Sequence, residues 1–471
     1  MDVVGRWIPL NFVYLAGAAR MAGLEAEIYD AMTKDHGYHE IEKHFRLSDA
    51  SYIATTAITS SINDAVKTLE LAKRVNPQVV TILGGVHPTF CYEEVLNSTP
   101  AVDYIVCGEG EVTIKELLQA LENGSILDDV PGLAFRWNGD IVKTSKRLLT
   151  GSVDDLPAAW DLLDWQDYKY FVIPNSRLGA INTCRVCDLD GISYSRQSIR
   201  ENTRRFRDPH KVVSEIVYLY ETYGVNVFLI TDECPTSDRE RWELFLDLVM
   251  ERNLPIYLLL QTSAADIVRD RDIMWKYRKA GVVHIYIGIE TNDQAAVDFI
   301  EKGLDVTEGK LALDIINEHG IISEASFVMG FPDETKKSIE RTLEQAQYYN
   351  PDNVQFLAFT PWPYADMYDD VKQYIRVYDY SKYNLIDPII EPKRMSLLQV
   401  DVAIVDCYRK FYMGKLTEVM TMKDEFKRGY LMRAMKLIMV SPVILKKLGM
   451  GTLRKVPAKI EEMMTRMKQD I

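Results

Sequence analysis

Two cysteines three residues apart in the sequence, Cys184 and Cys187, stand at the end of a predicted strand and are well suited to bind a metal. Thiolates are preferred ligands of zinc and of iron–sulfur clusters, which need several ligands converging on one small site. The next cysteine is Cys234, which follows an acidic pair after a second predicted strand. If the fold brings the three together they could bind zinc or an unusual cluster; otherwise Cys234 is a small buried apolar residue.

Loops rich in glycine and in hydroxyl groups follow the predicted strands of the N-terminal part of the chain. Strands are predicted over 25–32, 52–59, 79–87 and 102–110, with amphipathic segments between them, a pattern typical of a parallel sheet. Such sheets bind ligands beyond the carboxyl ends of their strands, where glycine allows close approach and hydroxyls donate hydrogen bonds. The strand-end loops there cover residues 55–61, 84–87 and 108–111. The alternative is that these loops are only tight turns.

A longer alternation of strands and helices begins near residue 179. The predicted strands cover 179–183, 226–231, 256–262, 282–291, 322–331 and 353–362. Six successive βα units favour a partial (β/α) barrel, in which functional residues gather at the carboxyl ends of the strands. Asp232, Glu233 and Glu290 stand at such ends.

Two further segments complete the predicted organisation. A hairpin around Asn138-Gly139 and a linker are predicted between the two sheets. The region after residue 385 is helical, and between Lys427 and Lys468 it has eleven Lys or Arg against two Glu. The segment 430–450 either caps the barrel with solvated basic edges or lies on an anionic membrane surface. The predicted domains are 1–129, 130–175, 176–385 and 386–471.

Composition narrows the class of protein. A chain of 471 residues is long enough for two or three domains, each with its own core. A net charge of -14 argues against nucleic acid as the main partner, because phosphate binding needs a basic surface. Six cysteines are too few for a disulfide framework, and no signal peptide or membrane-spanning stretch is visible. We therefore expect a cytoplasmic protein, with peripheral membrane contact left open.

An ordered set of motifs from about Pro9 to about Met413 resembles a known family. The motifs are YDAMTKD, TTAIT, VNPQVVTILGGVHPTF, GEGE, RDPHKVVSEI, DECPT, GFPDET, FTPWP and YRKFYM. Together they resemble the cobalamin-binding branch of the radical S-adenosylmethionine (SAM) superfamily, nearest to the anaerobic magnesium-protoporphyrin IX monomethyl ester cyclases. The resemblance implies an α/β chain with a Rossmann-like cobalamin-binding domain that lacks its first strand here. A partial (β/α)6 radical SAM barrel and a helical C-terminal region follow.

The resemblance also implies cofactors and ligand roles. Asp232 and Glu233 would hold the amine of SAM, and Glu290 would contact its ribose. The nucleotide tail of cobalamin would lie against the three N-terminal loops, at Thr55, Thr56, Thr59, Ser60, Ser61, Gly84, Gly85, His87, Gly108, Glu109 and Gly110. In the family a C-x-x-x-C-x-x-C motif ligates a 4Fe–4S cluster. Counting from Cys187 places Gly191 and Tyr194 at the other two positions, and counting from Cys184 places Asp188 and Gly191 there. The ordinary cluster is therefore not expected, and Cys184, Cys187 and Cys234 are left as a degenerate metal set.

Two functional classes follow from this resemblance. The first is a cobalamin-dependent enzyme acting on a small molecule or tetrapyrrole, with or without radical SAM chemistry. The second is a non-catalytic descendant that binds cobalamin or a tetrapyrrole. A damaged gene copy would give the same pattern, because a short altered patch would then lie between two intact stretches.

Overall fold

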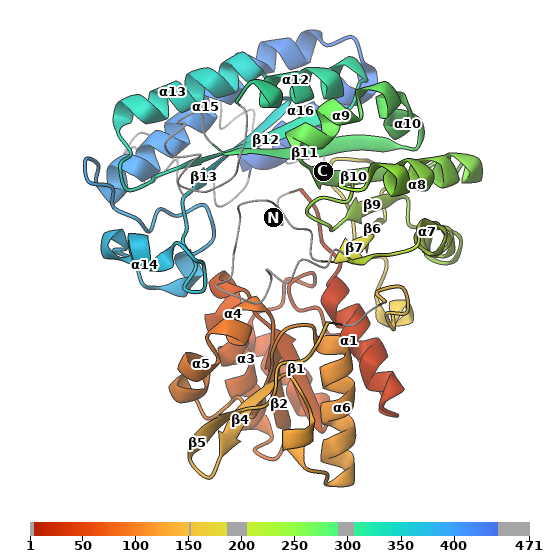
Figure 1. Ribbon diagram of the computed structural model, residues 1–471, viewed down its shortest axis with the longest axis vertical. Coiled ribbons are helices and arrows are strands. Elements are labelled where there is room, and N and C mark those ends of the chain that lie inside the picture. The colour runs from red at the N-terminus through yellow and green to blue at the C-terminus, as the bar shows by residue number, and fades with distance from the viewer. Residues whose placement is uncertain (1–3, 150–151, 186–204, 291–305, 441–471) are drawn as a thin grey trace.

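The computed structural model describes residues 4–149, 152–185, 205–290 and 306–440 (Figure 1). Two sheets, each flanked by helices, lie one above the other in Figure 1, the N-terminal sheet below and the larger sheet above. Helix α1 (Leu10–Met21) lies beside α6 on the N-terminal body and reaches up toward the second one.

The N-terminal sheet has the strand order β1-β2-β3-β4-β5. Its strands are β1 (Tyr52–Thr56), β2 (Val80–Gly84), β3 (Tyr104–Val106), β4 (Leu133–Trp137) and β5 (Asp140–Lys143). The first three are parallel, so their carboxyl ends meet at one edge, whereas β4 pairs antiparallel with both β3 and β5. The hairpin predicted at Asn138-Gly139 is confirmed: both residues have positive φ, as a two-residue hairpin turn requires.

Helices cover both faces of this sheet. They are α2 (Tyr38–Leu47), α3 (Ile62–Val75), α4 (Val86–Phe90), α5 (Tyr92–Ser98) and α6 (Gly110–Asn123), in addition to α1. Leu69 of α3 packs on one face with Leu83, and Leu117 of α6 packs on the other with Ile82. The loops at the carboxyl edge are thereby fixed between two packed layers.

The strand predicted over 25–32 is wrong, because the structure has no strand there. The side chain of Asp30 accepts hydrogen bonds from the backbone of Thr33 (3.0 Å) and from the hydroxyl of Tyr168 (3.0 Å). These hydrogen bonds stabilise a loop and not a strand. Ile28 packs against the core of the second sheet. Among the described residues, β1 is consequently an edge strand.

The second sheet contains six parallel strands in the order β6-β9-β10-β11-β12-β13, as the predicted partial barrel requires. They are β6 (Leu178–Ile181), β9 (Val227–Ile230), β10 (Tyr257–Thr262), β11 (Val282–Glu290), β12 (Ile322–Met329) and β13 (Asn353–Ala358). A separate two-stranded ribbon, β7 (Cys184–Arg185) with β8 (Arg205–Phe206), follows β6.

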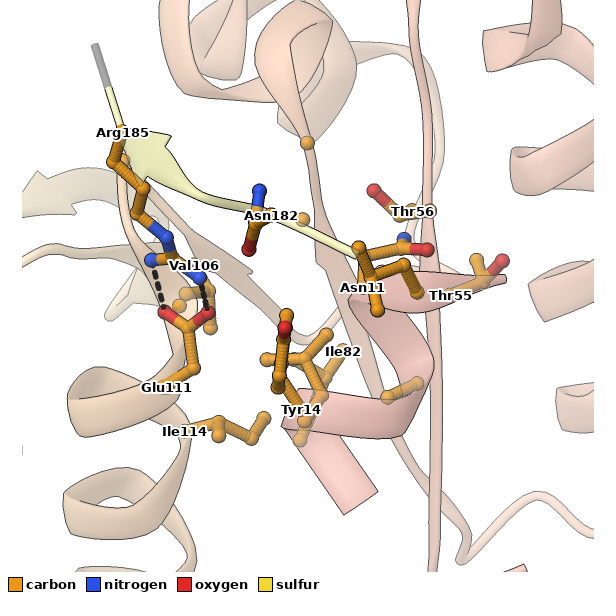
Figure 2. A pocket seen from close by; sticks show the side chains of 17 residues that line it. Asn11, Tyr14, Thr55, Thr56, Ile82, Val106, Glu111, Ile114, Asn182 and Arg185 are labelled. Atoms are coloured by element: carbon orange, nitrogen blue, oxygen red, sulfur yellow. Dashed lines mark hydrogen bonds and ion pairs between the residues drawn. The ribbon is translucent and has the colours of Figure 1, made fainter. Parts of the chain in front are cut away.

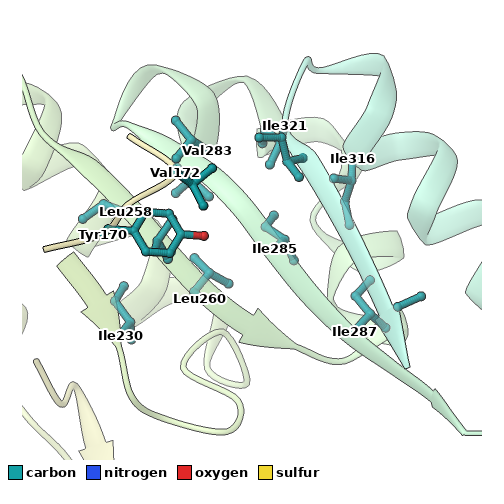
Figure 3. Packing of buried hydrophobic residues seen from close by; sticks show 14 of the residues in the cluster. Tyr170, Val172, Ile230, Leu258, Leu260, Val283, Ile285, Ile287, Ile316 and Ile321 are labelled. Carbon is teal, nitrogen blue, oxygen red and sulfur yellow. The ribbon is translucent and has the colours of Figure 1, made fainter. Parts of the chain in front are cut away.

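Helices on the outer side bury the Val- and Ile-rich strands of the second sheet. These helices are α7 (Pro209–Tyr223), α8 (Arg239–Arg252), α9 (Ala264–Arg269), α10 (Met274–Lys279), α12 (Val306–Glu318) and α13 (Lys336–Tyr349). Figure 3 shows Ile285 and Ile287 of β11 packed in line with Leu258 and Leu260 of β10. These residues are two apart along each strand, so their side chains lie on the same face of the sheet.

The C-terminal helices pack on the second sheet. They are α14 (Tyr368–Val371), α15 (Leu397–Thr421) and α16 (Glu425–Val440). Lys427 of α16 forms a 2.7 Å ion pair with Asp352, and both side chains are almost fully buried. The described part of α16 thus packs as a helical cap would, while residues 441–471 lie outside the described residues. No helix of the described chain is long and apolar enough to cross a membrane. Membrane contact and the four-part domain division both stay predictions.

Candidate functional site

A cavity of about 290 Å³ lies at the carboxyl ends of β1, β2 and β3, between α1 and the segment that follows β6 (Figure 2). Of the residues predicted from sequence, it is lined by Thr55, Thr56, Gly84, Gly85, Gly108 and Gly110. The predicted strand-end loops therefore do converge on one pocket, and residues of the second body close its remaining side.

Two glycines of the pocket have a backbone that other residues rarely adopt. Gly85 has φ +102, and a Cβ there would lie 2.4 Å from the carbonyl oxygen of Ala57. Gly85 is thus needed for close packing of two loops. Gly108 has φ +80, but a Cβ there would meet no atom within 4 Å. Gly108 therefore leaves open space at the pocket wall.

The other predicted residues of the first two loops do not line the pocket. His87 is fully buried, with its Nδ1 3.1 Å from the Thr59 hydroxyl, which donates to the hydroxyl of Tyr364 (3.3 Å). Burial lowers the pKa of His87 to about 4, and its Nε2 has no hydrogen-bond partner in the described structure. Ser60 and Ser61 form a 3-10 turn in which the Ser61 hydroxyl accepts from the backbone of Ile58. Thr59 and His87 therefore contact Tyr364 of the second body instead of lining the pocket.

The carboxylates of the GEGE motif form ion pairs with the β7–β8 ribbon. Glu109 accepts from Arg205 (3.0 Å), and Glu111 accepts from Arg185 (3.1 Å), as the dashed lines of Figure 2 show for the second pair. The two arginines lie directly opposite each other in the ribbon. Burial disfavours the charged form of Arg185, but the nearby Glu111 outweighs it and raises its pKa. Glu109 thus contacts the ribbon, and Glu111, from the same strand-end loop, lines the pocket.

Asp232 is buried and bonds to the backbone, so its carboxylate does not face an open binding site. Its carboxylate is 5% exposed and accepts from the backbone N–H groups of Thr183 (2.7 Å) and Cys184 (3.1 Å). Desolvation raises the pKa of Asp232, although these hydrogen bonds oppose the shift. Glu233 is exposed, and Glu290 ends β11 with its side chain outside the described residues. Their role toward SAM stays a prediction.

The described cysteines are not arranged as metal ligands. The Cys234 thiol donates to Asp266 (3.1 Å), and burial together with that carboxylate raises its pKa to about 11. Cys184 is buried in the β7–β8 ribbon, and Cys187 lies outside the described residues. Among the residues that the structure describes, no three His, Cys, Asp or Glu side chains could jointly hold a metal ion. The described residues thus supply no set of thiols converging on one site, which a cluster requires.

Sequence reasoning missed four polar residues of the pocket: Asn11, Tyr14, Asn182 and Arg185. Asn11 and Tyr14 lie on α1, ahead of the first strand, and the other two come from the second body. No local pattern marks them, because only the packing of the two bodies brings them to the strand ends. The hydroxyl of Tyr14 and the amide oxygen of Asn182 are buried without a hydrogen-bond partner in the described structure.

Comparison with known families divides the chain into the same two parts. A model of the B12-binding domain matches residues 2–118, and a model of the radical SAM superfamily matches residues 179–346. Among solved structures, the apo form of the cobalamin-dependent SAM radical enzyme OxsB covers 95% of this chain and 73% of its own, with a TM-score of 0.66 at 14% identity. The methyltransferase TsrM from Kitasatospora setae, solved with cobalamin and a 4Fe–4S cluster, covers 78% and 72% with a TM-score of 0.64 at 15% identity. These two likenesses establish the fold alone.

Curated relatives identify the family more closely. The anaerobic magnesium-protoporphyrin IX monomethyl ester cyclase of Rubrivivax gelatinosus is 33% identical over 93% of this chain and 80% of its own length. The protein of the same description from Cereibacter sphaeroides is 34% identical over 92% of this chain and 72% of its own. An alignment of this length and identity spans both bodies and the pocket between them. The chain therefore belongs to the family of the anaerobic magnesium-protoporphyrin IX monomethyl ester cyclase, with a B12-binding domain followed by a radical SAM domain.

Proposed function

We propose that this protein binds cobalamin in the pocket at the carboxyl ends of β1, β2 and β3 and does not cleave SAM through the family's ordinary cluster. The proposal rests on the open space and the unpartnered polar atoms at the pocket wall. Gly108 opens onto empty space, and the polar atoms of Tyr14 and Asn182 are left without protein partners. Buried polar groups are nearly always hydrogen-bonded, so unpartnered ones around a cavity favour a ligand.

The residues of the pocket fit a large, mostly apolar ligand with amide groups. Leu10, Leu15 and Ile82 supply apolar contact, while Thr55 and Thr56 supply hydroxyls. The cavity would take only the part of cobalamin that lies along the strand ends, because the whole molecule is far larger. When bound, cobalamin would supply a redox-active cobalt ion, and this chain would bind and orient it.

The described residues do not supply the ligands that the family's 4Fe–4S cluster needs. Cys234 donates to Asp266, and the sequence contains no third cysteine near Cys184 and Cys187. Asp232, the expected contact of the SAM amine, is engaged by two backbone N–H groups. We therefore derive no step through a cluster or through SAM.

The substrate class is inferred from the relatives alone. The relatives' names describe a cyclase of magnesium-protoporphyrin IX monomethyl ester. We infer that a tetrapyrrole is the small molecule that this protein binds or transforms beside cobalamin. Non-catalytic binding and cobalamin-dependent conversion of a tetrapyrrole both agree with the pocket.

Anaerobic titration of the full chain with hydroxocobalamin tests the first part of the proposal. After gel filtration, cobalamin should co-elute with the protein and show the visible spectrum of the base-off form, because the nucleotide tail would lie along the strand ends. No histidine should replace the base on cobalt, since none is among the described residues that line the pocket. A spectrum identical to that of free cobalamin, or elution of all the cobalamin in the small-molecule fraction, would contradict the proposal.

A further inference from the structure

We propose that Tyr14 and Asn182 form a subsite that recognises a carboxamide group of the bound corrinoid and selects against a carboxylate. The inference deepens the proposed function and rests on it, because it names the chemistry by which the same pocket chooses its ligand. Its basis is a pair of buried polar atoms, one from each body of the molecule, at the boundary where the ligand would lie.

Tyr14 supplies a donor with no protein acceptor. Its side chain is 3% exposed, its ring packs edge-on against Trp160, and it lines the pocket. Its hydroxyl has no hydrogen-bond partner in the described structure, although it is buried. Burial raises the pKa of Tyr14, so the hydroxyl keeps its proton at neutral pH and remains a donor. A hydroxyl left unpaired in this way is costly unless a ligand accepts from it.

Asn182 supplies an acceptor whose orientation is fixed. Its amide nitrogen donates to the hydroxyl of Thr231 (3.3 Å) and reaches Asp232 (3.5 Å). Asp232 can only accept in its ionised form, so it must meet the NH₂ side of the amide. The amide oxygen then points elsewhere, and it is buried without a partner. Both side chains line the pocket, and Figure 2 shows Asn182 between Arg185 and Asn11 in this view, with Tyr14 below it.

A donor and an acceptor that line the same pocket match the two polar ends of a carboxamide. The ligand carbonyl would accept from Tyr14, and the ligand NH₂ would donate to Asn182. A carboxylate would satisfy Tyr14 but would place negative charge against the amide oxygen of Asn182. The charged residues that line the described pocket are Arg185 and Glu111, which are paired with each other. No unpaired cation of that lining would compensate a ligand carboxylate, so its desolvation would be unfavourable.

The inference predicts a preference between two probes. Cobinamide carries amidated ring side chains, and cobyrinic acid carries carboxylates at the same positions. We expect the full-length protein to bind cobinamide at least tenfold more tightly than cobyrinic acid at neutral pH. In Tyr14→Phe and in Asn182→Ala, cobinamide binding should weaken about five- to tenfold each, as expected for one hydrogen bond to a ligand. The double variant should lose less than the product of the two, because one group bridges both residues.

Matched controls separate ligand recognition from folding. Tyr52→Phe removes a hydroxyl of the same domain that donates to Glu122, away from the pocket lining, and should leave both affinities unchanged. The melting temperature of ligand-free Tyr14→Phe should equal or exceed that of the wild type, because the lost hydroxyl has no partner. Wild-type affinities and selectivity in both pocket variants would overturn the subsite while leaving cobalamin binding intact. If the wild type bound neither cobalamin nor cobinamide, the proposed function itself would fail.

Discussion

The two parallel sheets end in loops of opposite character. At the carboxyl edge of β1, β2 and β3, polar atoms of Tyr14 and Asn182 lie around a cavity without protein partners. At the ends of β9 and β10, by contrast, three side chains donate hydrogen bonds to one carboxylate. Thr236 and Cys234 both donate to one oxygen of Asp266, and Arg269 donates to the other (2.9 Å).

This difference indicates where each sheet retains a capacity to bind. A group already paired inside the protein must break that pair before it can contact a ligand, whereas an unpaired buried group gains free energy from one. The first sheet end is therefore prepared for a ligand. Around Asp266, the polar groups of the second sheet end are already bonded within the protein, although the fold that would hold SAM is present.

The largest expected effect concerns the second sheet end. After anaerobic reconstitution with iron and sulfide, we expect iron well below the about four per chain of a 4Fe–4S cluster, and no 5′-deoxyadenosine from SAM. The reason is the donor set, because the sequence after β6 supplies at most two neighbouring thiols, Cys184 and Cys187, and Cys234 donates to Asp266 instead. Iron and acid-labile sulfide analysis, with electron paramagnetic resonance after dithionite reduction, measures this.

The variant Cys234→Ala provides the matched control for that experiment. It should change neither bound iron nor bound zinc, because Cys234 is paired within the protein. Loss of a stoichiometric metal in Cys234→Ala would instead restore the three-cysteine site and erase the contrast between the sheet ends.

The next effect concerns the opening at the first sheet end. Gly108→Ala should raise the Kd for cobalamin at least about tenfold, because its Cβ would enter the space reserved for the ligand. Gly139→Ala in the hairpin is a matched control, since Gly139 also has positive φ and open surroundings. Both variants should lose similar stability, of order 1–2 kcal/mol, from left-handed strain. Equal cobalamin affinities in the two variants, measured by titration, would contradict the assignment of the pocket.

A smaller effect concerns His87, behind the same loops. Its folded-state pKa of about 4 lies below the value near 6.5 of an exposed histidine, so the unfolded chain binds the proton more readily. The stability contributed by neutral His87 is therefore complete above about pH 6.5 and is lost as the pH falls toward 4. The lost free energy of unfolding should reach roughly 3 kcal/mol.

Denaturant unfolding between pH 7.5 and 4.5 measures this dependence. His87→Phe should flatten the curve, whereas substitution of the exposed His39 by Asn should leave it unchanged. Parallel curves for the wild type and His87→Phe would show that His87 is not buried in the neutral form.

Prediction from sequence succeeded where the relevant signal is local. Glycines such as Gly85 and Gly108 follow apolar strands, and parallel topology forces such strand ends to one edge. The strand predicted over 25–32 failed because Asp30 bonds to Tyr168, which is distant in sequence. Residues that depend on the packing of two bodies, such as Tyr14 and Arg185, could not be found, since no spacing along the chain encodes that contact.

The predicted roles of the polar loop residues show the same limit. Thr59 and His87 have the side chains expected of ligand contacts, yet they bind each other and Tyr364 across the junction. Composition gave the right chemistry for a strand-end loop, but it could not tell which side of the loop faces the pocket.

The paired arginines of the β7–β8 ribbon have a consequence for how the protein can evolve. Arg185 and Arg205 lie opposite each other, and like charges at such positions repel. Their neutralising carboxylates, Glu109 and Glu111, belong to the other body. The two bodies of one chain thus each supply half of these ion pairs. Exchanging one body for that of a distant relative would leave the arginines or the glutamates without their partners unless the matching residues were exchanged as well. Substitutions at these four positions should accordingly covary across the domain boundary.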